Sequence, residues 1–418
     1  MALLPGCYHS HVANELVWLA AVPRAQAAGP ALGADLRAHE NYAADHHASV
    51  AAARAGLPAA RAGVAVAALP ANPELRIGGE YGAAASTSDR NVTVVHFPVP
   101  NPMLVPLAVA VAEARVHAGN AAVLAVQWQV RRDVRLAWVQ LQWALADQRL
   151  AQVGLDLQQS RAAWARSAAQ AGALEPMISQ QAALAWVDAQ DRMARASEAI
   201  DLAKAQLAQA TGSPHTFAPS DSDSLGACPM PPDVTASGSG ADAVAGHPAL
   251  AVWKARYAGA DDSAALEHGM AIPWFKAVQV GTETMSYDGA RSVRLAAYIE
   301  VPLFHWLGAT NRQAEAERER FHSEYLATAT ALVQGRALAL AQWRLAHSRW
   351  SRLQADVVPA VDAAVGAAER AVAARRWSAA VLFAAQERQL EAQVQLLDAA
   401  RVCNQAAVSF GWFAGPAR

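Results

Sequence analysis

The sequence predicts a mainly α-helical protein with a small β part, built from a duplicated unit of two strands and long coiled helices. Three observations support this fold class. Similar segments recur at a near-constant distance along the chain, short segments alternate apolar and polar residues, and two stretches of about 70 residues carry almost no helix breaker after their first turns. With 54% hydrophobic and 17% charged residues among 418, the chain is not intrinsically disordered.

Charge and motifs exclude several function classes. The net charge is −2 and the pI is near 6.7, without a basic stripe, so nucleic acid is not an expected partner. No nucleophile elbow, phosphate loop or H-E-x-x-H motif occurs, so we expect no enzyme, no cofactor and no metal site. Cys7, Cys228 and Cys403 are too few and too scattered for a disulfide framework or a Cys-based zinc site. No uncharged apolar run of about 18 residues predicts a membrane-spanning helix.

An internal repeat organises the chain. Val99-Pro100 corresponds to Val301-Pro302 at an offset of 202, and Ala68-Leu69-Pro70 corresponds to Ala271-Ile272-Pro273 at an offset of 203. Such offsets indicate a duplicated unit. The predicted division is a signal or tail segment 1–30, a first repeat 31–212, a Pro/Ser/Gly-rich linker 213–245, a second repeat 246–413 and a tail 414–418.

The N-terminal segment allows several interpretations. A short apolar core is followed by Ala25-Gln26-Ala27, the pattern of a secretory cleavage site. Leu4-Pro5-Gly6-Cys7 has the form of a lipoprotein acylation box, so Cys7 is a candidate for lipidation. The simpler alternative is that Cys7 is a free thiol in a disordered tail.

Strand-like segments precede each long helix. In 73–82, Leu75 and Ile77 alternate with charged residues, and 291–302 alternates in the same way. Segments 91–100 and 273–284 alternate less regularly. Each is close to the roughly 10 residues of a tilted membrane β-strand. The alternative is a hairpin whose apolar face rests on a globular core.

The long helices are predicted at Met103–Ala171 and Leu303–Ala374. At about 1.5 Å per residue each would reach about 100 Å, too long for a compact domain, so each must coil against neighbours. Gly154 and Pro359 interrupt them at equivalent points and suggest a shared bend. An Ala-rich apolar stripe with 4-3-4-3 spacing marks one contact face: Val130, Val134, Ala137, Leu141 and Ala144.

Four strands of this length cannot close into a membrane barrel, because the smallest barrels have about eight. Open sheet edges in lipid would leave backbone groups unpaired, at several kcal/mol each. A membrane location therefore requires several copies, and three copies would give a 12-stranded barrel with the helices continuing as a coiled tube.

The order of these elements resembles the TolC-type outer-membrane efflux proteins, over residues 31–413. The segments that carry the resemblance are Leu69–Leu75, His247–Leu250, Val301–Phe304 and Val358–Asp362. The first and last are similar to the heavy-metal cation-efflux (Czc/Cus-type) branch. The resemblance implies a homotrimer in outer-membrane lipid, with a 12-stranded barrel and a periplasmic α-helical barrel. It also implies docking on a periplasmic adaptor (membrane fusion) protein and an inner-membrane proton-driven pump, without catalysis.

Candidate functional residues follow from this resemblance. Arg375 and Arg376 would ring the tunnel entrance, where like charges repel unless acids such as Glu369 or Asp362 pair with them; the alternative is a set of solvated charges on an exposed turn. The family's Gly-then-Ser tip is present only in part, and the second repeat has no Gly there. Adaptor contact is expected at Gly172, Ala173, Leu174, Trp377 and Ser378. Lumen-facing strand residues would be Glu74, Arg76, Glu80, Arg294 and Glu300.

The predicted function is an outer-membrane channel of a tripartite efflux pump that exports heavy-metal cations. The same channel could serve organic compounds or type I secretion. A protein of another class, a soluble periplasmic coiled-coil scaffold or adaptor, is the remaining alternative. Two duplicated hairpins with paired strands argue against it, because adaptors usually have one helical hairpin.

Overall fold

The structure, a computed structural model, describes residues 35–80, 90–213, 227–230, 242, 244–285, 291–301 and 308–415. The segment 1–30 with Cys7 and most of the linker 213–245 lie outside the described residues. The chain divides into two compact units. Unit 1 is Met1–Ala51, Gln127–Ala243 and Val333–Arg418; unit 2 is Ala52–Val126 and Val244–Leu332. Each unit therefore draws on both halves of the predicted repeat, and each is described by itself.

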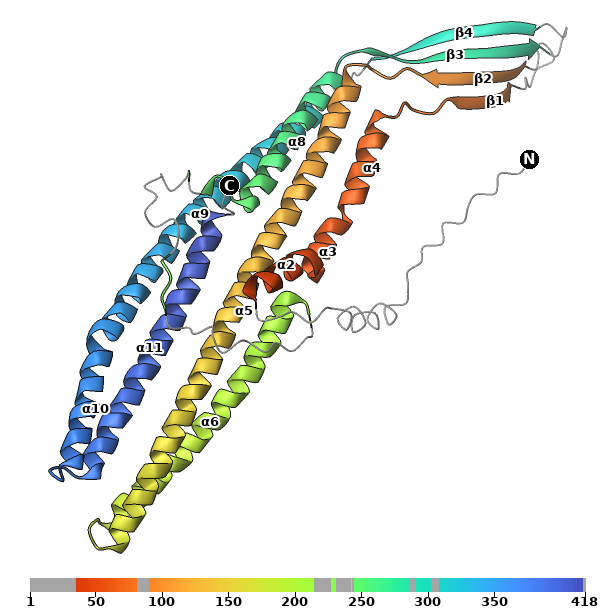
Figure 1. The fold of residues 1–418 in the computed structure, drawn as a ribbon. Helices are drawn as coiled ribbons and strands as arrows, with labels where there is room; N and C mark the ends of the chain where they lie inside the picture. Colours follow the sequence, from red (N-terminus) through yellow and green to blue (C-terminus); the bar gives the residue numbers. More distant parts are fainter. Residues whose placement is uncertain are drawn as a thin grey trace. The chain divides into compact units, whose positions relative to one another are not determined.

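Unit 2 contains one antiparallel sheet. Its strands are β1 (Glu74–Glu80), β2 (Arg90–Pro98), β3 (Trp274–Met285) and β4 (Arg291–Glu300), in the order β1-β2-β3-β4. The first repeat supplies one hairpin and the second repeat the other, and β2 pairs with β3 (Figure 1). All four predicted strand segments are confirmed to within about two residues, and the alternation is most regular in β1 and β4.

The helices of unit 2 are α4 (Leu57–Ala68), α8 (Pro248–Met270) and the first parts of α5 (Leu104–Gln170) and α9 (Ala309–Arg352); α3 (Ala48–Ala55) precedes α4. His247 caps α8: its Nδ1 accepts the backbone N–H of Ala249 at 3.2 Å, and Pro248 follows it at the start of the helix. Helices α5 and α8 pack closely, since a Cβ built on Gly259 would lie 2.8 Å from Cβ of Ala114.

Unit 1 contains two helical hairpins. The first pairs the rest of α5 with α6 (Pro176–Thr211), and the second pairs α9 and α10 (Val358–Ala373) with α11 (Ala379–Ala414) (Figure 1). The short helix α2 (Leu36–His46) packs on α5, where Glu40 forms an ion pair with Arg135. The overall content of 78% helix and 10% strand confirms the mainly helical class with a small β part.

Of the two predicted interruptions, the structure has only the one in the second repeat. Helix α5 runs without interruption through Gly154, whereas the π-helical segment η2 (Leu353–Val357) separates α9 from α10 just before Pro359. Proline has no N–H for the helical ladder, and the wider turn accommodates it. Gly154 has a different role: a Cβ there would lie 2.9 Å from Cδ2 of Leu390 on α11, so the glycine allows close packing of these helices.

Small side chains form the cores between the helices of unit 1. Val134, Leu141 and Ala144 of the predicted stripe are buried, which confirms it as a contact face. Nearer the hairpin turns the core consists of Ala162, Ala165 and Ala182, flanked by Trp164 and Trp186. Alanine at such positions lets helix backbones approach one another.

Helix α5 contains one 18-residue window that is long and apolar enough to cross a membrane, judged by length and composition only. The sequence predicted no membrane-spanning helix, because it contains no uncharged apolar run of about 18 residues; this window contains at most two charged residues. A core helix of a soluble protein passes the same test, and 22% of the window is buried. One such window is weak evidence for a membrane-spanning helix.

Candidate functional site

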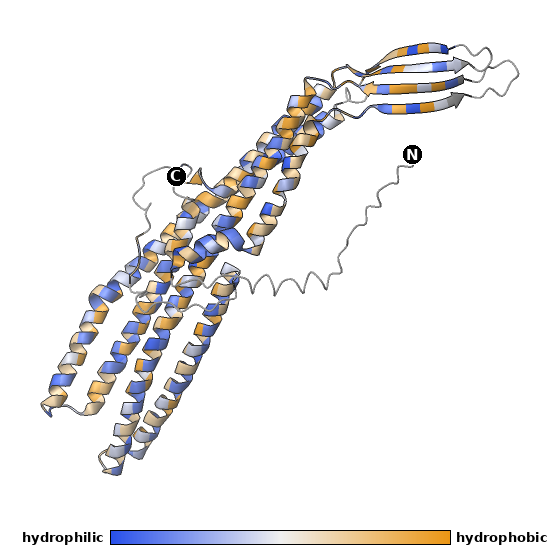
Figure 2. Cartoon of the chain, turned by 45° about the vertical axis from the view of Figure 1, so that its right-hand side comes forward, coloured by the Kyte–Doolittle hydropathy of each residue, from blue (hydrophilic) through white to orange (hydrophobic). Residues whose placement is uncertain are grey.

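The sheet of unit 2 has one apolar face and one polar face. Its strand register places Leu75, Val95, Val280 and Leu295 in one row across the sheet. The adjacent row on the same face contains Ile77 and Val293, and Figure 2 shows hydrophobic and hydrophilic residues alternating along the strands. The predicted alternation is therefore confirmed.

Nothing among the described residues covers the apolar face. Ile77, Val293 and Leu295 are 75%, 79% and 75% exposed. A hairpin resting on a globular core would bury such residues, so the structure disfavours that alternative. The sheet also has two open edges, because no described strand pairs with the outer sides of β1 and β4.

The polar face carries the residues predicted to face a lumen. Glu74 and Arg76 form an ion pair at 3.1 Å, and Glu300 pairs with Lys276 at 3.4 Å. Arg294 lies on the same face as Arg76 through the row Arg76–Val94–Gly281–Arg294. The side chain of Glu80 lies outside the described residues.

Sequence reasoning missed a contact on this face, near the end of the sheet where β2 and β4 continue toward the helices. The hydroxyl of Tyr298 donates to Oε1 of Gln279, and the rings of Tyr298 and His96 lie 5.3 Å apart. These side chains come from β4, β3 and β2. Only the register brings them together, so no local motif could have revealed them.

In unit 1 the two hairpin turns have the same backbone design. The N–H groups of Gly172 and Ala173 donate to Ala169 O and Ala168 O at 3.0 and 2.9 Å. The N–H groups of Arg375 and Arg376 donate to the equivalent carbonyls, those of Val372 and Ala371, at 2.9 Å each. Both are Schellman turns, and the second places Arg375 where the first has glycine.

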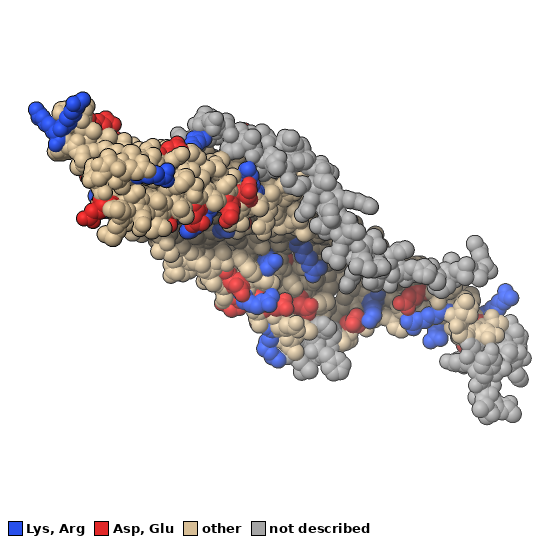
Figure 3. Space-filling view, turned by 90° about the horizontal axis from the view of Figure 1, so that it is seen from below, with Lys and Arg blue, Asp and Glu red and all other residues tan. Residues whose placement is uncertain are grey.

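Most of the tip residues predicted to contact an adaptor are exposed. Gly172, Ala173 and Ser378 are exposed, Leu174 is half-buried, and Trp377 is 51% exposed. Arg375 and Arg376 are exposed beside them, and Figure 3 shows basic side chains projecting at the far left, where the α10–α11 turn lies in Figure 1.

The acids predicted to pair with these arginines lie elsewhere. Asp362 accepts a hydrogen bond from Nε2 of Gln389 at 2.7 Å, within the α10–α11 hairpin. Glu369 is exposed, and among the described residues no ion pair joins either acid to Arg375 or Arg376. In the single chain the two arginines are solvated.

A polar cluster links the two hairpins on the tip side of the long helices. Glu387 of α11 forms an ion pair with Arg161 of α5 and accepts from Nε2 of Gln158 at 2.7 Å. The partners are more than 220 positions apart in the sequence, and no spacing rule could have paired them.

Two of the three cysteines form a disulfide, Cys228 with Cys403, although the sequence predicted no disulfide framework. The two residues are 175 positions apart, and only the folded helices of unit 1 show that they meet.

No protein-family model and no curated protein matches this sequence, but solved structures match its fold. CusC, described with conformational changes accompanying folding and transmembrane channel formation, is 16% identical, with 93% of this chain and 94% of that chain covered and a TM-score of 0.74. The outer-membrane channel OprN is 17% identical, with 91% and 89% covered and a TM-score of 0.73. The outer membrane protein VceC from the bacterial pathogen Vibrio cholerae is 16% identical, with 91% and 96% covered and a TM-score of 0.70. The chain thus has the TolC-type outer-membrane channel fold that the sequence resemblance implied.

Proposed function

We propose that this protein is the outer-membrane channel of a tripartite efflux pump. It is a passive exit duct without catalytic chemistry, located in the cell outer membrane with a periplasmic helical extension. A periplasmic adaptor and an inner-membrane proton-driven pump would deliver the substrate. The fold shared with CusC, OprN and VceC supports this proposal.

The observation that carries the proposal is the uncovered sheet. An apolar face with Ile77, Val293 and Leu295 in solvent would be unfavourable in a soluble protein, at about 25 cal/mol per Å² of apolar surface. Lipid removes this penalty, but the unpaired backbone groups at the β1 and β4 edges would then have no water to bond. Pairing β4 of one copy with β1 of the next removes both problems, and three copies of four strands make a closed 12-stranded barrel.

The hairpin tips are the proposed docking end. In a trimer Arg375 and Arg376 would form rings at the entrance, with Glu369 and Asp362 of a neighbouring copy as partners. The exposed residues Gly172 and Trp377 would touch the adaptor. Support comes from the exposure of both turns and from the positive φ of Arg375.

For the substrate we propose heavy-metal cations, on the strength of the Czc/Cus-type sequence elements. The polar face of the sheet carries both signs of charge: Arg76 and Lys276 pair with Glu74 and Glu300. Charges balanced in this way do not favour cations, so the pump would choose the substrate. Organic compounds and type I secretion remain the alternative cargoes of the same duct.

Membrane fractionation followed by gels of unheated and boiled samples tests the proposal. We expect an outer-membrane band near three times 44.0 kDa that collapses to the monomer on boiling. A soluble monomer would contradict the channel and favour the periplasmic scaffold. Growth of a deletion strain on zinc or copper salts and on organic dyes, with and without the restored gene, then separates metal from organic substrates.

A further inference from the structure

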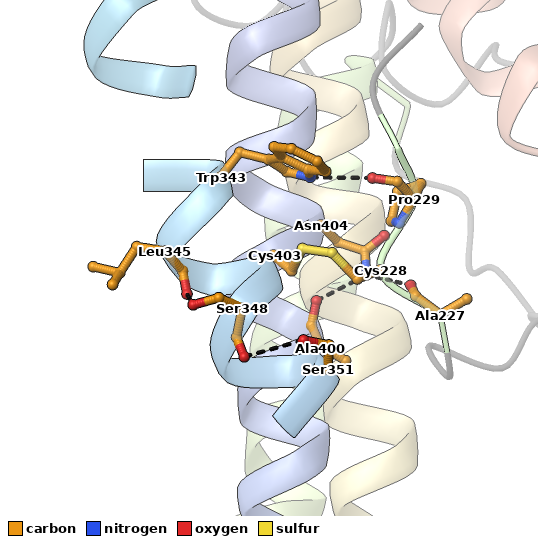
Figure 4. The surroundings of a disulfide bond; sticks show 10 residues. All are labelled: Ala227, Cys228, Pro229, Trp343, Leu345, Ser348, Ser351, Ala400, Cys403 and Asn404. Atoms are coloured by element: carbon orange, nitrogen blue, oxygen red, sulfur yellow. Dashed lines mark hydrogen bonds between the residues drawn. A yellow bond between two sulfur atoms is a disulfide. The ribbon is translucent and has the colours of Figure 1, made fainter. Parts of the chain in front are cut away.

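Residues 227–230, here called the strap, are fastened to helices α9 and α11 of unit 1. Cys228 is bonded to Cys403 of α11. Nε1 of Trp343 on α9 donates to the carbonyl of Pro229 at 3.1 Å, and Nδ2 of Asn404 on α11 donates to the carbonyl of Ala227 at 3.1 Å. Figure 4 shows these three attachments within three consecutive residues of the strap.

The strap completes an apolar core. Cys228 packs with Trp343, Ala346, Cys403 and Ala406 in one buried cluster, in which Cys403 is fully buried and Trp343 is 5% exposed. Without the strap, the indole N–H of Trp343 would lose its partner, the carbonyl of Pro229, and Cys403 would lose its contact with Cys228. A hydrogen bond of this kind contributes about 0.5–1.5 kcal/mol, so docking the strap stabilises the packing of α9 against α11.

We propose that a thiol oxidant of an extracytoplasmic compartment installs this disulfide after α11 has formed, and that the bond locks the strap over Trp343 as a step in the maturation of unit 1. Disulfides form and persist in such compartments and not in a reducing cytosol. The partner is an oxidoreductase or small molecule that carries a reactive disulfide. This inference goes beyond the efflux function and does not depend on it.

Burial orders the two exchange steps. With the strap docked, Cys228 is 8% exposed and Cys403 is fully buried, so oxidation begins while the strap is undocked. The thiolate of Cys228, which lies outside any helix or strand, attacks the oxidant's disulfide and releases one oxidant thiolate, which leaves a mixed disulfide. The thiolate of Cys403 then attacks the sulfur of Cys228 and releases the second oxidant thiolate. Two protein thiols are thereby oxidised to one disulfide, and the oxidant's disulfide is reduced to two thiols, which take up the two protons.

The bond also encloses most of the second repeat. The chain between Cys228 and Cys403 includes α8, β3, β4, α9 and α10. Loops of this length lose much conformational entropy in the unfolded state when they are closed, which stabilises the folded state. Burial of the sulfurs further predicts that mild reductants act slowly on the folded protein.

Thiol counting tests the proposal in a Cys7→Ser background, in which only this pair can react. The protein is taken from cells with its thiols trapped by acid and then alkylated with a maleimide after denaturation. We expect no labelled thiol before reduction and two after it. Growth with dithiothreitol should give the two-thiol form, and the disulfide should form again when the reductant is removed. Two labelled thiols in protein from untreated cells would overturn the proposal.

A second measurement reports on the strap itself. Relative to Cys7→Ser, the additional Cys228→Ser change should lower the melting temperature by about 5–10 °C and open the strap to limited proteolysis. Trp343→Phe is the control, because it keeps the disulfide and should leave the strap protected. Equal melting and equal cleavage in the Cys228→Ser and parent proteins would overturn the lock. If Cys228→Ser does not accumulate, folded parent protein reduced by a phosphine in mild denaturant replaces it, with the same expected and contrary results.

Discussion

Arg375 adopts, between α10 and α11, the left-handed backbone conformation that Gly172 adopts between α5 and α6. Their φ angles are 55° and 71°, and they lie 203 positions apart, which is the offset of the repeat. Left-handed backbone costs an L-residue about 1–2 kcal/mol, and glycine avoids this. An arginine at a strained position supports a role for its side chain at the tip.

Replacing Arg375 by glycine should therefore stabilise the turn while weakening the proposed docking. The amide of Arg376 donates to Ala371 O. We expect this amide to exchange more slowly with solvent, because the free energy needed to open the turn should rise by about 0.5–1 kcal/mol. Export activity in cells should fall at the same time. Hydrogen exchange of the purified protein and growth on the exported substrate measure the two effects.

Two variants separate strain from charge at this turn. Arg375→Ala removes the charge but keeps the Cβ, so it should lower export without slowing exchange. Gly172→Ala should speed amide exchange at the α5–α6 turn, because it should lower the free energy of opening that turn by about 1 kcal/mol. Faster exchange in Arg375→Gly would contradict the account of the turn.

The cluster around Glu387 should hold the two hairpins together. Glu387→Ala removes the acceptor of both Arg161 and Gln158. We expect the free energy of unfolding to fall by about 1 kcal/mol, since the pair is partly exposed. If the hairpins separate when the duct opens, this variant should also raise the conductance of single channels in planar bilayers.

A charge exchange provides the control for this pair. Arg161→Glu or Glu387→Arg alone should destabilise the contact, and the double variant should recover melting temperature and conductance. A double variant as impaired as the sum of the single variants would show that the two side chains do not act together.

Much of the fold could be predicted because its signals are local. Alternation located the strands, and the scarcity of breakers located α5 to within a residue at each end. The Ala-rich stretch before β1 is divided into α2, α3 and α4, and Pro58 lies in the first turn of α4. The bend at Gly154 was predicted from glycine alone, but close packing against Leu390 explains that residue.

The remaining features depend on contacts between distant parts of the chain. The Cys228–Cys403 bond, the Arg161–Glu387 pair and the contact of Tyr298 with Gln279 leave no periodic signal. The turn at Arg375 was unpredictable for another reason: a left-handed arginine violates the local preference that a sequence pattern relies on.

Close packing of helices in unit 2 predicts opposite effects at two glycines. Gly259→Ala would place a Cβ 2.8 Å from Cβ of Ala114 and should lower stability by about 1 kcal/mol. Gly63→Ala, on α4, meets nothing within 4 Å and should raise stability by about 0.5–1 kcal/mol. Thermal melting by circular dichroism in detergent compares them, and equal shifts would contradict this packing.

The claim that lipid covers the apolar face of the sheet is tested most directly at two adjacent residues of β4. Leu295 lies on the apolar face and Ala296 on the polar face. A lysine facing the middle of a membrane costs about 2–4 kcal/mol in a barrel, whereas a lumen tolerates it. In outer-membrane fractions run on unheated gels, Leu295→Lys should lose the heat-sensitive trimer band and Ala296→Lys should keep it. If Leu295→Lys assembles as well as Ala296→Lys, water and not lipid faces the apolar side, and the channel account is wrong.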